Sequence, residues 1–213
     1  MTIAVLADEI LKKEFSSRAF PPHVEIIWAD SVRSLMIIEA DAYFDLEYSF
    51  QPERLRQLAK LFPSPVLVNS VPNTTRQLGE GFIRINAWPT MLKRTVAELA
   101  IGKGVDEKAV QSLFTALNWK YQLVDDLPGM IVPRIIAMII NEAYYTLEAG
   151  VSTKQEIDIA MKLGTNYPMG PFEWSTAIGL KNIEALLREL SRNDSRYMVC
   201  PLLESEANAV DGP

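Results

Sequence analysis

Short apolar runs alternate with helical patterns along the first half of the chain. The runs are four or five residues long and lie at residues 3–6, 24–28, 42–46, 65–69 and 82–85. Helical patterns lie among them at residues 8–15 and 52–61. Short strands that are apolar throughout and separated by helices are typical of a parallel sheet with helices on its faces. The pattern therefore predicts a doubly wound α/β fold for this half.

Two more strands and one more helix complete the predicted α/β half. Residues 96–101 and 121–124 are apolar enough to be strands. Between them, Asp106 is placed to cap a helix over residues 107–118. The apolar residues of that helix recur every three or four positions and form one face: Val110, Leu113, Phe114 and Leu117.

From residue 128 onward the pattern is helical throughout. A long apolar helix is predicted over residues 131–149, and Thr153 and Glu156 have the spacing of a capping box at the start of the next helix. A last helix is predicted from an apolar stripe, Ile183, Leu186, Leu187 and Leu190. The change of pattern predicts two domains, an α/β domain over residues 1–127 and an all-helical domain over residues 128–213.

The backbone is most constrained around Gly170. A capped amphipathic segment runs into Gly164, and Pro168 and Pro171 then stand on either side of Gly170. Each proline fixes its own φ and has no backbone N–H. The spacing therefore predicts a turn and then a helix that restarts with Pro171 in its first turn.

Composition narrows the classes of function. There are 21 Lys and Arg against 27 Asp and Glu, a formal net charge of −6, without a basic cluster along the sequence. This balance disfavours nucleic acids and anionic membranes as partners. The single cysteine, Cys200, allows no internal disulfide and no thiolate metal site. The chain opens on no signal-peptide pattern, and its apolar stretch at 130–140 is too short to span a bilayer, so we expect a cytoplasmic protein.

Four motifs stand out in the helical half: PGxIVxR at 128–134, NEA at 141–143, EIDxAMKLG at 156–164 and YPMGPFE at 167–173. With Gly179-Leu180, Arg196-Tyr197 and Pro201-Leu202-Leu203 they cover residues 127–203 in one register. In this register the segment resembles the C-terminal domain of 3-hydroxyacyl-CoA dehydrogenases. The resemblance implies the fold of that domain and a homodimer formed through it.

The first half resembles the NAD-binding domain of the same family more faintly. Residues 65–70, PVLVNS, match a strand that leads into an Asn-Thr-Ser turn, and residues 82–99 align without gaps with the strand that bears the catalytic histidine. Between Asp30 and Ala42 there is no room for the family's long second helix. The resemblance therefore implies a truncated Rossmann-like domain.

The residues that perform the family's reaction are largely replaced in this chain. The family moves a hydride between NAD and the 3-carbon of an acyl-CoA, while a histidine exchanges the hydroxyl proton and a glutamate twelve residues later orients it. These positions align with Asn86 and Glu98. An amide can donate a hydrogen bond but cannot replace the imidazole as a base. Glu98 is then either a remnant of the catalytic pair or a structurally paired acid.

Other positions of the family's substrate site also differ. The two asparagines that help to polarise the substrate carbonyl and place the cofactor align with Pro89 and Pro133, which have no side-chain donor. The serine of the Asn-Thr-Ser turn aligns with Val71 or with Ser70, for which turn formation is an alternative role. The single histidine, His23, is interpreted as a surface residue.

The cofactor site is predicted to be degenerate. A dinucleotide fold needs glycines directly after its first strand, but here Ala7-Asp8-Glu9 follow and the first glycine is Gly79. Two acids at this helix start would repel the phosphates of NAD. Asp30, after the second strand, occupies the position of a ribose-binding acid, although capping of a loop would also explain it.

Three hypotheses remain open from the sequence. The first is a relative of 3-hydroxyacyl-CoA dehydrogenases in acyl-CoA metabolism that is catalytically impaired and binds an acyl-CoA or another protein. The second is an active oxidoreductase with an altered site that still uses NAD. The third is a non-catalytic subunit that pairs with a catalytic homologue through the helical half.

Overall fold

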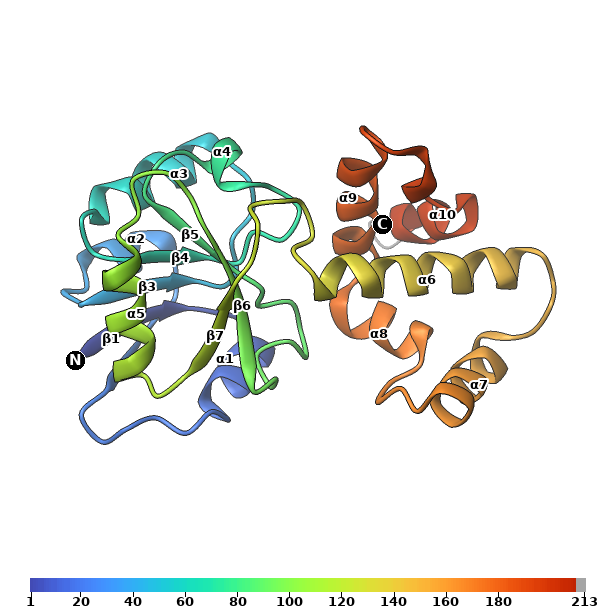
Figure 1. The fold of residues 1–213 in the computed structure, drawn as a ribbon, viewed down its shortest axis with the longest axis horizontal. Coiled ribbons are helices and arrows are strands. Elements are labelled where there is room, and N and C mark those ends of the chain that lie inside the picture. Colours follow the sequence, from blue (N-terminus) through green and yellow to red (C-terminus); the bar gives the residue numbers. More distant parts are fainter. Residues whose placement is uncertain (210–213) are drawn as a thin grey trace. The chain divides into compact units, whose positions relative to one another are not determined.

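The computed structural model describes residues 1–209, and its chain divides into two compact units (Figure 1). The first unit is Met1–Met130 and the second begins at Ile131. This division falls three residues after the domain boundary that the sequence pattern suggests. The two units are described separately below.

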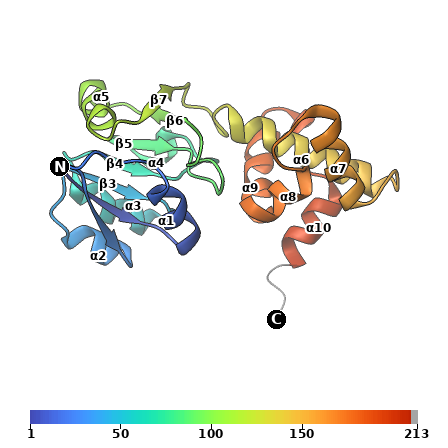
Figure 2. The ribbon, with the colours of Figure 1, turned by 90° about the horizontal axis from the view of Figure 1, so that it is seen from below.

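The first unit is built on a seven-stranded sheet with the order β2-β1-β3-β4-β5-β6-β7. Figure 2 shows β7, β6, β5, β4 and β3 following one another from top to bottom. Neighbouring strands are parallel except for β5 and β6, which are antiparallel. The strands are β1 (Thr2–Leu6), β2 (Glu25–Ala29), β3 (Ala42–Asp45), β4 (Val66–Val68), β5 (Phe82–Ile85), β6 (Val96–Ile101) and β7 (Lys120–Leu123).

Helices cover both faces of this sheet. One face packs against α1 (Glu9–Ser16) and α5 (Glu107–Ala116), and its core includes Phe15, Phe44 and Phe114. The other face packs against α2 (Val32–Ile37), α3 (Pro52–Leu58), η1 (Ala59–Leu61) and α4 (Thr75–Leu78). Apolar packing on both faces explains why most positions of the central strands are apolar. The predicted doubly wound class is confirmed, and its sheet is predominantly parallel.

The strand β6 runs antiparallel to β5, which differs from the predicted parallel sheet, because the connection 86–95 returns the chain without a crossover helix. The segment between Asp30 and Ala42 holds only a six-residue helix, α2, in agreement with the expectation that a long second helix does not fit there. Ser31 caps α2 by accepting a hydrogen bond from the Ser34 backbone N–H at 3.1 Å.

The second unit is all-helical in the residues that are described. It contains α6 (Val132–Glu148), α7 (Lys154–Thr165), α8 (Pro171–Ile178), α9 (Leu180–Ser191), η2 (Ser195–Tyr197) and α10 (Pro201–Ala209). The predicted capping box is present, since Thr153 Oγ1 accepts from the Glu156 N–H and the Glu156 carboxylate accepts from the Thr153 N–H. The helix α9 carries the predicted apolar stripe but is not the last helix, because α10 follows it.

The join between α7 and α8 has the predicted geometry. The helix α7 continues through Gly164 and ends where Asn166 adopts a left-handed conformation with φ of 57°. The helix α8 begins at Pro171, as predicted. Its first turn is held by Asp158 of α7, whose Oδ1 accepts from the Phe172 N–H at 2.8 Å. Glu173 accepts from the Gly170 N–H at 2.9 Å.

Candidate functional site

Asn86 and Glu98 meet across the antiparallel pair β5 and β6. Asn86 follows the last residue of β5, and its backbone N–H donates to the carbonyl of Glu98 at 3.0 Å. Its side-chain Nδ2 donates to Glu98 Oε2 at 3.1 Å. Asn86 is 4% exposed and Glu98 is 9% exposed. The fold therefore brings together the two residues that align with the family's catalytic pair.

The Asn86–Glu98 pair can hold a hydrogen bond but cannot relay a proton. A carboxamide does not titrate, so Nδ2 remains a donor and Oδ1 remains an acceptor at every working pH. Oδ1 accepts from the Trp88 backbone N–H at 3.4 Å. The only histidine of the chain, His23, is exposed on the segment before β2. The amide thus provides a partner for a buried carboxylate, which is the structural role open to Glu98.

The loop after Asn86 is fastened to the first helix. Both carboxylate oxygens of Glu14, on α1, accept from the Thr90 backbone N–H, at 2.7 and 2.9 Å. Thr90 has a positive φ of 79°, which is uncommon for a β-branched residue. Glu14 is 4% exposed, so this contact is a buried anchor for the loop that carries Pro89. The sequence pattern gave no signal for this role of Glu14.

Ser70 lies in the turn after β4 and is buried. Its Oγ donates to the backbone carbonyl of Asn73 at 3.3 Å, which is the turn-forming role. The neighbouring Asn69 is more central. Its Nδ2 donates to the carbonyls of Leu46 and Ala87, at 3.1 and 3.2 Å, and its Oδ1 accepts from the Ala87 N–H. Asn69 therefore ties the ends of β3, β4 and β5 together, a role that the sequence pattern did not indicate.

A fully buried arginine donates hydrogen bonds to the backbone of the same turn. Arg84, on β5, donates from Nε to the Ser70 carbonyl and from Nη2 to the Val71 carbonyl, both at 2.8 Å. Its Nη1 pairs with Asp126 at 2.8 Å. Asp126 also accepts from the N–H and the hydroxyl of Thr75 at the start of α4. Arg84 is therefore a structural cation that fixes the turn containing Ser70.

The order of the sheet places its topological switch point between β1 and β3. In open α/β sheets, ligands bind beyond the carboxyl ends of the strands at such a point. Here Asp8 follows β1, Asp45 ends β3, and Glu47 follows it. Burial raises the pKa of Glu47, and the negative charges of Asp8 and Asp45 raise it further. The switch point is thus acidic.

The acids at the switch point are already engaged with the protein. Asp8 caps α1, since its Oδ1 accepts from the Leu11 N–H at 2.8 Å. Asp45 is fully buried and forms a bidentate pair with Arg54, with contacts of 2.7 and 2.5 Å. Burial raises the pKa of Asp45, and the pairing with Arg54 opposes that rise.

These residues do not fit the pyrophosphate of NAD. The turn between β1 and α1 contains no glycine, and at the helix start the Leu11 N–H is already bonded to the Asp8 carboxylate. Asp30, the candidate ribose ligand, is exposed at the end of β2. Its backbone N–H donates to Ser34 Oγ at 3.0 Å, but Ser31 and not Asp30 caps α2.

Within residues 1–209, no three His, Cys, Asp or Glu side chains are grouped so that they could hold a metal ion. No helix in that part of the chain is both long and apolar enough to cross a membrane.

Pro133 lies in the first turn of α6, where a missing N–H is tolerated. The substrate-site asparagine that the resemblance expects at this position is therefore replaced by a helix-starting residue.

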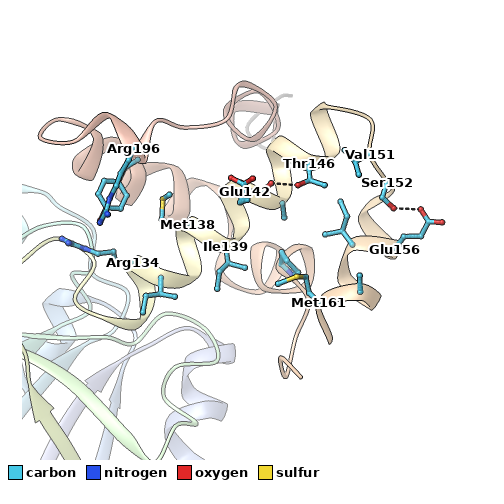
Figure 3. A pocket seen from close by; sticks show the side chains of 16 residues that line it. Arg134, Met138, Ile139, Glu142, Thr146, Val151, Ser152, Glu156, Met161 and Arg196 are labelled. Atoms are coloured by element: carbon cyan, nitrogen blue, oxygen red, sulfur yellow. Dashed lines mark hydrogen bonds between the residues drawn. The ribbon is translucent and has the colours of Figure 1, made fainter. Parts of the chain in front are cut away.

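The helical unit carries a wide apolar groove between α6 and α7 (Figure 3). Its volume is about 770 Å³. Ile135, Met138 and Ile139 of α6 form one wall, and Ile157 and Met161 of α7 form the other. Arg134 and Arg196 lie at one end, whereas Glu156 lies at the other (Figure 3). The groove is apolar with charged ends, a composition that is typical of interaction surfaces.

Comparison with known proteins identifies the relatives of this chain. Residues 129–210 match the family of 3-hydroxyacyl-CoA dehydrogenase C-terminal domains. The 3-hydroxyadipyl-CoA dehydrogenase of Escherichia coli is 45% identical over 91 residues, which are 42% of this chain and 19% of that protein. A probable 3-hydroxybutyryl-CoA dehydrogenase of Bacillus subtilis is 30% identical over 194 residues, which are 90% of this chain and 57% of the relative. The chain thus spans between 19% and 57% of the length of these two relatives.

Solved structures agree with these sequence matches. The (S)-3-hydroxybutyryl-CoA dehydrogenase of Ralstonia eutropha has the same fold, with a TM-score of 0.73 at 19% identity over 98% of this chain and 94% of that one. The 3-hydroxybutyryl-CoA dehydrogenase of Escherichia coli is 31% identical over 67% of this chain and 31% of its own, with a TM-score of 0.59. The helical half therefore belongs to the family of 3-hydroxyacyl-CoA dehydrogenase C-terminal domains, and the chain as a whole is similar to 3-hydroxyacyl-CoA dehydrogenases.

Proposed function

We propose that this protein is a 3-hydroxyacyl-CoA dehydrogenase relative of acyl-CoA metabolism that no longer catalyses the family's reaction. The observation that carries the proposal is the buried hydrogen bond of 3.1 Å between Asn86 and Glu98. It joins the two positions that align with the family's catalytic pair, and it has an amide where the family has the base. Loss of a general base alone lowers a rate by about 10² to 10⁴.

The cofactor side of the site supports the same proposal. NAD would have to bind where Asp8 caps α1 and where Glu47 adds a further carboxylate. Asp8 already accepts a hydrogen bond from the start of α1, where a pyrophosphate would bind, and the carboxylate of Glu47 would repel the pyrophosphate. The proposal therefore includes the absence of NAD binding, while an acyl-CoA remains the proposed ligand.

The test is a pair of measurements on the whole chain. We expect no NADH oxidation with acetoacetyl-CoA above background, and no heat of binding when NAD or NADH is titrated by calorimetry. An active family member, assayed in parallel, serves as the positive control. Turnover at an ordinary enzymatic rate, about 1 to 10³ s⁻¹, would overturn the proposal and favour an active oxidoreductase with an altered site.

A second copy of the chain is the proposed partner, bound through the groove between α6 and α7. The observation that favours it is the exposure of apolar side chains there, with Ile135 55% exposed and Val151 71% exposed. A two-fold contact is self-complementary, so charges of opposite sign at the two ends of the groove would face each other. A catalytic homologue bound by the same face is the alternative.

A reducing, cytoplasmic location completes the proposal, because Cys200 is buried and free.

A further inference from the structure

A pocket of about 480 Å³ in the α/β unit is surrounded by positive charge. It lies between the end of α1, the segment before β6 and the turn between α5 and β7. Its lining includes no acidic residue and four cations: Arg18, Lys93, Arg94 and Lys120. In a chain of net charge −6 such a concentration of one sign is unexpected. Like charges gathered without anions repel one another, which disfavours the empty arrangement.

Arg18 is held firmly in the pocket by neutral groups. Its guanidinium carbon lies 4.0 Å from the centre of the Trp119 ring. Its Nη1 donates to the Leu92 carbonyl at 3.2 Å, and its Nη2 donates to the Thr95 carbonyl at 3.3 Å. No carboxylate is paired with it within residues 1–209. Burial lowers the pKa of Arg18, which shows that the cation has lost water without gaining a counter-charge.

The other cations of the pocket are also available to a ligand. Lys93 has one carboxylate partner in the described residues, Glu14, which lies 3.7 Å from its Nζ. The Glu14 carboxylate already accepts the Thr90 N–H with both oxygens. Arg94 and Lys120 form no ion pair in the described residues. The adjacent Trp119 is 5% exposed, and its Nε1 is buried without a hydrogen-bond partner. The pocket thus offers donors and positive charge but no acceptor side chain that is acidic.

We propose that this pocket binds the phosphate groups of a small molecule. Backbone carbonyls take two of the five N–H donors of Arg18, so further donors of the fixed guanidinium remain for phosphate oxygens, and neighbouring lysines supply further charge. The volume is sufficient for a pyrophosphate. The indole of Trp119 already stacks on Arg18 and is not free to stack on a nucleobase. Recognition therefore rests on the phosphate groups. Inorganic pyrophosphate, a nucleoside diphosphate and the phosphorylated end of coenzyme A share this chemistry.

This inference is independent of whether the protein catalyses the family's reaction. The cations come from three separate segments, which is why the sequence shows no basic cluster. The site is also separate from the switch point, since its lining includes neither Asp8 nor Glu47.

Calorimetry with the whole chain tests the site. Pyrophosphate, ADP and coenzyme A are titrated separately, with sodium chloride at matched ionic strength as a blank. We expect binding of at least one phosphate compound, weakened at least tenfold by the double substitution Lys93→Ser and Arg94→Ser. The control variant carries Arg33→Ser and Lys60→Ser, which remove the same charge from exposed positions on α2 and η1.

The pattern of binding identifies the source of the phosphates. Equal affinity for all three compounds indicates that pyrophosphate alone is recognised, whereas a preference for coenzyme A indicates its phosphorylated end. The indole N–H resonance of Trp119 should shift on binding in the wild type. Absence of binding by all three compounds, or equal loss in the pocket and control variants, would overturn the proposal.

Discussion

At the scale of single residues, Asn86 aligns with the family's catalytic histidine, but its amide cannot act as a base. The substitution Asn86→His would return an imidazole to a position within hydrogen-bond reach of Glu98. We expect the imidazole pKa to rise above about 6.5, because the neighbouring carboxylate favours its charged form. The measurement is a titration of the imidazole resonances by NMR, with His23 as the internal reference for an exposed histidine.

The same variant should remain inactive as a dehydrogenase. A restored base does nothing for the acidic turn between β1 and α1, where Asp8 and Glu9 stand in place of glycines. We therefore expect Asn86→His to show no NADH oxidation with acetoacetyl-CoA, although its imidazole titrates. Recovery of activity by this single change would show that NAD binds in spite of Asp8 and Glu9.

Arg84 and Asp126 form an ion pair in which the cation is fully buried. Arg84 is fully buried, and its side chain donates to the backbone carbonyls of Ser70, Val71 and Leu127 besides pairing with Asp126. The substitution Asp126→Asn would leave this cation buried without a counter-charge. We expect a loss of about 3 kcal/mol in the free energy of unfolding, measured by urea denaturation. Asp125→Asn, at the exposed neighbouring position, should change stability by less than about 0.5 kcal/mol.

Asp126 also predicts the response of the fold to acid. Although burial alone would raise its pKa, hydrogen bonds from Thr75 and the pairing with Arg84 lower it below the usual value. A carboxylate with a lowered pKa contributes stability at pH values above its unfolded pKa of about 3.9, and loses it as the pH falls through the folded value. The difference in stability between wild type and Asp126→Asn should therefore shrink below about pH 4. A difference that stays unchanged well below about pH 4 would show that the charge of Asp126 does not contribute to stability.

At the scale of elements, the join between α7 and α8 depends on the absence of a side chain at Gly170. A Cβ at this position would lie 2.2 Å from Asp158 Oδ1, the oxygen that holds the first turn of α8. We expect Gly170→Ala to destabilise the helical unit by about 1 to 3 kcal/mol in denaturant unfolding. The matched control is Gly164→Ala, where a Cβ meets nothing within 4 Å inside α7. That change should stabilise by up to about 1 kcal/mol, since alanine favours the helix.

Elements governed by local chemistry could be predicted from the sequence. Thr153 and Glu156 cap α7, and Pro171 starts α8, because caps and prolines act on their own neighbours along the chain. The direction of β6 could not be predicted, since an apolar run gives a strand but not its partner or orientation. The anchors Glu14 and Asn69 were missed for the same reason, because their partners lie 76 and 18 residues away.

The candidate site was predictable only as far as the family resemblance reaches. A spacing of twelve residues placed Asn86 opposite Glu98, and the fold joins them. The resemblance had no counterpart for the pocket around Arg18, whose cations lie on three segments. Its charge becomes visible only when α1, β6 and β7 are assembled, so no linear pattern could have indicated it.

At the scale of the whole molecule, each unit has its own buried core. The sheet unit is centred on residues such as Phe15, Phe44 and Leu67. In the helical unit α6, α8 and α9 bury Ile140, Ile183 and Leu187. The helical unit leaves apolar side chains exposed in the groove, among them Ile135 and Val151. An apolar surface of this kind on a folded protein is typical of a contact with another chain.

A change of charge in the groove tests the proposed homodimer. The wild type should elute as a dimer at micromolar concentration, with its mass determined by light scattering. Ile135→Glu should convert it to a monomer, because a carboxylate placed in the apolar wall of α6 would be buried without a partner at the interface. Ile37→Glu is the matched control, since Ile37 is 80% exposed at the end of α2, in the other unit. A wild type that is already monomeric would contradict the homodimer. A variant that stays dimeric would place the dimer contact outside this groove. A shift that appears only in the presence of a catalytic homologue would instead assign the groove to a mixed complex, since the same face cannot serve both partners at once.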